Sequence, residues 1–127
     1  MAIRVRLWAT GIVVPAGGET MNRVDSVGGF SDGASYALSL GVMNGDFFTH
    51  VLAFSPGFFR ALEPHGRPRI YISHGTNDRV LPIDPCSRRI VAQLKGAGYD
   101  VTYKEFNGGH TVPEERRHEA VELFLRR

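Results

Sequence analysis

Three residues whose side chains can together perform acyl transfer, Ser31, Asp78 and His110, stand in turns spread along the chain. Ser31 is the centre of a G-x-S-x-G sequence at 29–33, whose small flanking residues permit the sharp, strained turn that exposes a nucleophilic hydroxyl. Since the chain contains 15 glycines, this short pattern is not specific by itself. Its position between a predicted strand and a predicted helix is the stronger indication, because such a turn must lie there.

Asp78 and His110 each lie in a loop that follows a predicted strand. Asp78 is part of the loop 74–82, and His110 comes directly after two glycines at 108–109, whose backbone freedom allows an imidazole to turn inward. Taken singly, Asp78 could belong to an ordinary turn and His110 could face solvent. Together with Ser31, the order serine, acid, histidine after successive strands predicts a catalytic triad.

Each member of this predicted triad has a distinct role. His110 is expected to take the proton from Ser31 as the hydroxyl attacks a carbonyl, which leads to an acyl-enzyme. Asp78 is expected to hold the imidazole in the required tautomer. The backbone N–H of Asp32, at the start of a helix, is expected to donate one hydrogen bond to the developing oxyanion.

The elements that must position these residues are indicated by apolar periodicity and by glycine and proline breakers. Strands and helices alternate, which predicts an α/β fold with a mostly parallel sheet, arranged as a three-layer αβα sandwich. A segment at 3–14 is expected to be an edge strand or hairpin. The predicted strands are 24–29, 50–55, 69–73 and 101–106, and the predicted helices are 34–43, 85–97 and 113–125.

Composition places the chain among ordinary globular domains. Its 127 residues are 43% hydrophobic and 22% charged, so we expect one partial domain over 1–127 with an atypical N-terminal segment at 1–22. The single cysteine, Cys86, fits a reducing compartment and an ordinary helix face, so a cytoplasmic location is predicted. No apolar run is long enough to span a membrane, and we expect no signal peptide because charged and polar residues interrupt the apolar start. A net charge of +2 with dispersed basic residues argues against nucleic-acid binding.

Four stretches resemble the phospholipase/carboxylesterase family of α/β-hydrolases, which includes the acyl-protein thioesterases. They are 28–34, 54–57, 74–82 and 109–110, and the resemblance extends over Val24 to Arg127. It implies the C-terminal part of an α/β-hydrolase fold. It also implies a serine hydrolase acting on small-molecule carboxylic esters, or on thioesters or lysophospholipids, with no metal and no organic cofactor.

The chain departs from this family before Ser31, where only about thirty residues stand in place of several strands. The loop that normally donates the second oxyanion hydrogen bond is among the missing parts, and Gly17 or Gly18 is the candidate replacement, with an ordinary surface turn as the alternative. An uncovered sheet edge further predicts a homodimer or higher homo-oligomer.

Phe30, Phe58 and Phe59 are predicted to contact substrate, although most phenylalanines of this region are expected to be core.

Two other functions stay open. The chain could be a catalytically weak or inactive hydrolase remnant that acts as a binding or assembly module. It could also bind anionic ligands, an interpretation that rests only on a sequence pI near 9.0.

Overall fold

The parallel sheet is the part of the molecule that positions every candidate residue. The computed structural model describes residues 12–13, 25–61 and 63–126. Within them, the sheet has five strands in the order β1 (Ile12–Val13), β2 (Asp25–Phe30), β3 (Phe48–Phe54), β4 (Arg69–Gly75) and β5 (Val101–Phe106). Strands β2 to β5 run parallel, and β1 pairs with β2 in the antiparallel direction.

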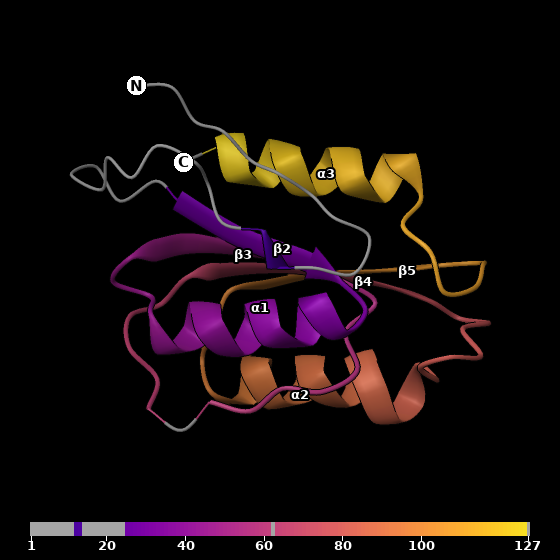
Figure 1. Cartoon of the computed structure of the whole chain (residues 1–127), viewed down its shortest axis with the longest axis horizontal. Coiled ribbons are helices and arrows are strands. Elements are labelled where there is room, and N and C mark those ends of the chain that lie inside the picture. The colour runs from indigo at the N-terminus through magenta and orange to yellow at the C-terminus, as the bar shows by residue number, and fades with distance from the viewer. Residues whose placement is uncertain (1–11, 14–24, 62, 127) are drawn as a thin grey trace.

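Helices cover both faces of this sheet. Helix α1 (Asp32–Met43) and helix α2 (Arg89–Gly96) lie on one face and α3 (Glu114–Leu125) lies on the other, as Figure 1 shows. Each helix joins two parallel strands or follows the last one, as expected for β-α-β crossovers. The predicted α/β fold class and its three-layer sandwich are therefore confirmed.

Burial on both faces explains why β3 and β4 are continuous apolar runs rather than alternating ones. Six of the seven residues of each strand are buried. The core lies in two layers. One layer packs under α1 and α2 and contains Val27, Leu38, Val51, Ile70, Ile72 and Leu94, whereas the other packs under α3 and contains Leu52, Phe54, Tyr71 and Ala120.

The strand registers bring the carboxyl ends of the strands level with one another. Phe30 at the end of β2 pairs with Phe54, Phe54 pairs with Ser73 of β4, and Ser73 pairs with Lys104 of β5. Because parallel strands all end at the same edge, the loops that follow β2, β4 and β5 meet there. This edge is where the sequence places its three reactive side chains.

Most predicted elements differ from the structure by one or two residues at their ends, and the helix predicted at 85–97 also differs in kind. The helix expected over 85–97 starts with a π-helical turn, η1 (Asp84–Arg88), in which the N–H of Arg88 donates to the carbonyl of Ile83 at 3.0 Å. Only then does α2 follow. Cys86 lies in η1 as a buried free thiol, and burial raises its pKa. Of the segment 3–14, only β1 falls within the described residues.

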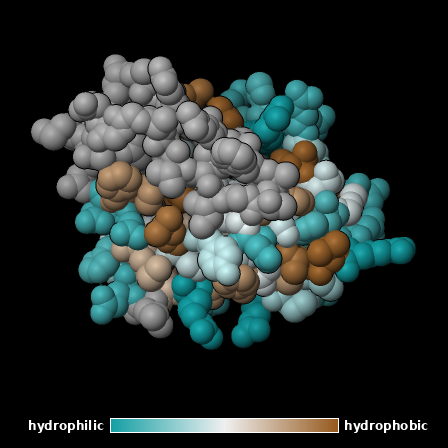
Figure 2. Space-filling model, in the orientation of Figure 1, coloured by the Kyte–Doolittle hydropathy of each residue, from teal (hydrophilic) through white to brown (hydrophobic). Residues whose placement is uncertain are grey.

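The surface carries several separate apolar residues. In the view of Figure 2 they form small patches between polar side chains. Tyr36, Phe47, Phe58, Val80 and Leu125 are the large apolar side chains that are exposed among those described. Among the residues that the structure describes, no helix is both long and apolar enough to cross a membrane. The homo-oligomer expected from the sequence stays a prediction.

Candidate active site

Ser31 occupies a strained turn between β2 and α1. Its backbone angles, φ 62° and ψ −125°, lie in a region that residues with a side chain rarely adopt. The turn is held from both sides, because the N–H of Ser31 donates to the carbonyl of Phe54 at 2.9 Å and its carbonyl accepts from Ala34 at 2.9 Å. The fold thus imposes the unusual backbone that the pattern at 29–33 predicts.

The side chains of Ser31, His110 and Asp78 form one hydrogen-bonded row. The Ser31 hydroxyl lies 2.9 Å from Nε2 of His110, and Nδ1 of His110 lies 2.6 Å from Oδ2 of Asp78. An ionised carboxylate can only accept, so Nδ1 carries a proton and Nε2 of the neutral ring accepts from the hydroxyl. A hydroxyl, an imidazole and a carboxylate in this order can transfer a proton away from an attacking oxygen.

The row leads from the surface into the interior. Ser31 is half-buried, the His110 side chain is 14% exposed, and the Asp78 side chain is fully buried. Burial alone would raise the pKa of Asp78. However, hydrogen bonds from the N–H of Leu81 and from His110, the charge of a protonated His110 and the N–H of Val80 hold this pKa below its usual value. The carboxylate therefore stays ionised and can stabilise an imidazolium.

The loops that carry Asp78 and His110 are joined to each other. The N–H of Thr76 donates to the carbonyl of Phe106 at 2.9 Å, and the N–H of Asn77 donates to the carbonyl of Gly108 at 2.9 Å. The amide of Asn77 also donates to the Asn107 side chain at 3.0 Å. These bonds fix the two loops relative to each other, so the separation of acid and histidine is set by backbone rather than by side chains alone.

A glycine at the end of β4 makes this close approach possible. A Cβ built on Gly75 would meet the carbonyl oxygens of Gly108 and Gly109 closer than the 3.0 Å that real Cβ atoms keep. Any larger residue at position 75 would therefore push away the loop that precedes His110. No local feature of the sequence marks this requirement, because it joins residues from two different strand ends.

Phe30, predicted as a substrate contact, packs directly on the candidate base. Its ring centroid lies 4.7 Å from that of His110, with the planes tilted by 40°. Phe30 is half-buried and also packs against the core layer under α3. It therefore fixes one face of the imidazole, whether or not it also touches a substrate.

A second histidine lies behind Asp78, and no role was predicted for it. His74 is fully buried in β4, and its Nε2 lies 2.6 Å from the carbonyl of Leu81 and 3.2 Å from Oδ2 of Asp78. Its Nδ1 lies 2.5 Å from the hydroxyl of Ser87 in η1. The only signal in the sequence was that His74, like His110, follows a strand and has a glycine beside it.

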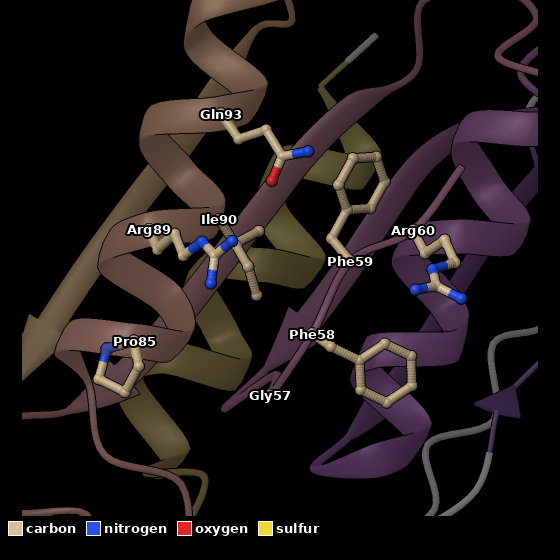
Figure 3. A pocket seen from close by; sticks show the side chains of 8 residues that line it. All are labelled: Gly57, Phe58, Phe59, Arg60, Pro85, Arg89, Ile90 and Gln93. Atoms are coloured by element: carbon tan, nitrogen blue, oxygen red, sulfur yellow. The ribbon is translucent and has the colours of Figure 1, made fainter. Parts of the chain in front are cut away.

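A groove lies between the segment after β3 and helix α2. It has a volume of about 370 Å³. Figure 3 shows Arg89, Ile90 and Gln93 of α2 on one side and Phe58 and Phe59 on the other. Two of the residues predicted to contact substrate thus line this groove, and Phe59 also packs against the core.

Ser35 connects this groove to the nucleophile turn. Its hydroxyl accepts from the N–H groups of Gly57 and Phe58 at 2.8 and 3.1 Å. Ser35 lies one helical turn after Ser31 and its own N–H donates to the Ser31 carbonyl at 3.1 Å. The groove therefore begins within one turn of α1 from the candidate nucleophile.

The predicted oxyanion donors fall into two groups. Asp32 is the first residue of α1, a position whose N–H has no acceptor within its own helix. Gly17 and Gly18 lie outside the described residues. Among the residues that the structure describes, no group of three or more His, Cys, Asp or Glu side chains could hold a metal ion.

Comparison with known proteins finds a thioesterase and two esterases that are similar to this chain. No protein-family model matches the chain. It is 36% identical over 114 residues to acyl-protein thioesterase 1 of Gibberella zeae, covering 80% of this chain and 46% of that protein. Its structure is similar to that of esterase PE8, with a TM-score of 0.65 and 26% identity over 76% of this chain and 47% of the other.

A second solved structure shares the fold. The carboxylesterase of Bacillus cereus superimposes with a TM-score of 0.63 at 24% identity, over 76% of this chain and 47% of that one. The chain therefore spans about half the length of the proteins it matches.

Proposed function

We propose that this chain, which belongs to the phospholipase/carboxylesterase (acyl-protein thioesterase-like) family of α/β-hydrolases, hydrolyses carboxylic esters or thioesters with Ser31 as nucleophile. The observation that carries the proposal is the hydrogen-bonded row from the Ser31 hydroxyl through His110 to Asp78. The positive φ of Ser31 supports the proposal independently, because strained backbone of this kind is concentrated at active sites.

The proposed reaction has two steps. In the first, the Ser31 oxygen attacks the ester carbonyl while Nε2 of His110 takes its proton, and Asp78 stabilises the resulting imidazolium. The tetrahedral intermediate collapses as His110 gives this proton to the leaving alcohol or thiol, which leaves an acyl-enzyme. In the second step, His110 deprotonates a water that attacks the acyl group, and Ser31 is regenerated with the free acid as product.

Charge that develops on the carbonyl oxygen needs donors at the same place. The N–H of Asp32 is proposed as one of them, since it stands at the N-terminus of α1, where the helix dipole also favours negative charge. Gly17 or Gly18 stays the prediction for a second donor. Losing one such donor typically lowers kcat by about 10²–10³-fold, so kcat depends strongly on whether a second donor is present.

The groove next to Ser35 is the proposed place for the acyl group. Phe58 and Phe59 provide apolar surface there, and Phe58 is 43% exposed, although its ring packs edge-on against Tyr36. Burying a side chain of this size against a ligand stabilises binding by about 1.5–3 kcal/mol. Phe58→Ala should therefore raise KM for esters with longer acyl chains more than it raises KM for acetate esters.

The experiment that tests the function combines turnover with active-site labelling. The full chain is assayed with p-nitrophenyl acetate and treated with a fluorophosphonate probe, beside Ser31→Ala and His110→Ala. Ser26→Ala is the matched control, because Ser26 is a buried serine near the start of β2 and its hydroxyl has no partner among the described residues.

The proposal expects labelling of the parent protein and of Ser26→Ala, and none of Ser31→Ala. Turnover should fall by about 10⁴-fold or more in Ser31→Ala and in His110→Ala. Turnover that Ser31→Ala leaves unchanged would refute the assignment of the nucleophile. A folded parent protein with neither labelling nor turnover would instead favour a hydrolase remnant that acts as a binding module.

A further inference from the structure

His74 is a buried histidine that the reaction described above does not use. It lies near the end of β4 with no exposed surface, and each ring nitrogen has a partner. Burying an imidazole is unfavourable unless its polar atoms are satisfied, so this arrangement restricts the ring to one orientation. The partners are Asp78 and Leu81 from the loop after β4 and Ser87 from η1.

The positions of the protons follow from these partners. The carbonyl of Leu81 can only accept, so Nε2 of His74, at 2.6 Å, carries a proton. In the neutral ring Nδ1 is then an acceptor, and the Ser87 hydroxyl at 2.5 Å donates to it. Burial lowers the pKa of His74 despite the Leu81 carbonyl and the charge of Asp78, which act in the opposite direction. The ring is thus neutral, with its single N–H facing the acid.

The same N–H faces two acceptors that belong to one turn. Besides the Leu81 carbonyl, it lies 3.2 Å from Oδ2 of Asp78, the oxygen that accepts from His110. The N–H groups of Val80 and Leu81 donate to the other carboxylate oxygen, Oδ1, at 2.9 and 2.8 Å. By holding the Leu81 carbonyl, His74 therefore fixes the residue whose N–H in turn donates to Oδ1.

We propose that His74 is a positioning residue, which orients the carboxylate of Asp78 toward His110 through its Nε2–H, in a tautomer set by the Leu81 carbonyl and satisfied at Nδ1 by the Ser87 hydroxyl. It acts through Asp78 and does not touch the substrate. The inference rests on the proposed function of the row that begins at Ser31. It extends that row by one buried histidine and one serine from η1.

Two amide variants of His74 separate its two hydrogen bonds. Glutamine places its amide nitrogen the same number of bonds from Cβ as Nε2, so His74→Gln can keep the donor toward Leu81 and Asp78. Asparagine reaches only as far as Nδ1, so His74→Asn can keep the acceptor for Ser87 and loses the donor. Both variants put a neutral amide in the same cavity, which makes each the control for the other.

For p-nitrophenyl acetate, His74→Asn should lower kcat by about 10- to 100-fold with KM nearly unchanged, the range typical when a group that orients an active-site ligand is removed. His74→Gln should stay within about 3-fold of the parent kcat. Equal kcat values for the two variants, after correction for the folded fraction measured by circular dichroism, would overturn the proposal.

A spectroscopic measurement tests the same inference without turnover. The proton between Nδ1 of His110 and Oδ2 of Asp78 should give a far-downfield signal in the proton NMR spectrum, because the bond is short. This signal should persist in His74→Gln and shift or disappear in His74→Asn. If it is unchanged in both, His74 does not position the acid. A parent protein that shows the signal but has no esterase activity would contradict the proposed function and leave this inference standing.

Ser87→Ala provides a second route if His74→Asn does not fold. It removes the donor to Nδ1 of His74 from a residue that touches neither Ser31 nor His110. We expect kcat to fall by about 3- to 10-fold, since the buried Nδ1 of His74 then has no donor and the ring is held less firmly. Ser26→Ala, a buried serine without such a bond, should leave kcat unchanged. Equal kcat values for the two serine variants would also overturn the proposal.

Discussion

Replacing Gly75 by alanine should separate the candidate acid from the candidate base without changing either residue. Gly75 is the last residue of β4, and a Cβ there would meet the carbonyl oxygens of Gly108 and Gly109. These oxygens belong to the two residues that precede His110. The added methyl group would therefore act on the loop that carries the imidazole.

The expected magnitude follows from the space available. The new Cβ would lie closer than 3.0 Å to backbone atoms that have no flexible end to move aside. Ordinary contact between a carbon and a carbonyl oxygen needs at least about 3.3 Å, so the loop must retreat by about 1 Å. The bond of 2.9 Å between His110 and Ser31 would then exceed the usual length of a hydrogen bond. A displacement of this size typically costs about 10²-fold in rate.

The same crowding should also reduce stability. Forcing an extra methyl group into a packed site costs about 1–3 kcal/mol in the free energy of unfolding. We expect Gly75→Ala to lower kcat for p-nitrophenyl acetate by about 10²-fold and to lower the urea midpoint. Both are measured on the purified full chain, with kcat corrected for the folded fraction.

Gly96→Ala is the matched control. Gly96 ends helix α2, and a Cβ built there would meet nothing within 4 Å. This variant should keep the parent kcat and gain up to about 1 kcal/mol of stability, since alanine favours a helix over glycine. A folded Gly75→Ala protein with the parent kcat would refute the reasoning, because the loop of His110 would then tolerate the methyl group.

The remaining predictions concern stability away from the row. Burial, together with the charge of Arg69, lowers the pKa of His50 to about 4. The unfolded chain binds this proton near its ordinary pKa of about 6.5, so stability should fall as the pH drops from about 6.5 to 4. His50→Phe should flatten this dependence in urea titrations, and an unchanged slope would contradict the assignment. Tyr71→Phe removes a hydrogen bond of 2.9 Å to Glu119 of α3 and should cost about 1 kcal/mol by urea unfolding. Tyr71→Phe stability equal to the parent would show that this bond does not hold α3. Gly41→Ala should cost about 1–3 kcal/mol by the same measurement, because α1 packs too closely on β3 to accept a Cβ, and a neutral effect would contradict that close packing.

Local features of the sequence were sufficient to predict the order of the elements. Apolar runs bounded by glycine and proline predict strands such as 50–55 and 69–73, because burial on both faces of a parallel sheet leaves a local mark on each of these strands. The turn at Ser31 was also predictable, since its glycines are adjacent in the chain. The candidate triad followed from chain order and from the rule that loops after parallel strands meet at one edge.

Contacts between distant residues were decided by the tertiary structure alone. The bonds of His74 to Ser87 and to Leu81, and the need for glycine at position 75, depend on how the strands align and how closely two loops pass. A helix or strand pattern records which face of an element is buried, but not which partner lies opposite it. For this reason the sequence could name the reacting side chains, whereas only the folded chain determines the distances, tautomers and close packing that would let them act together.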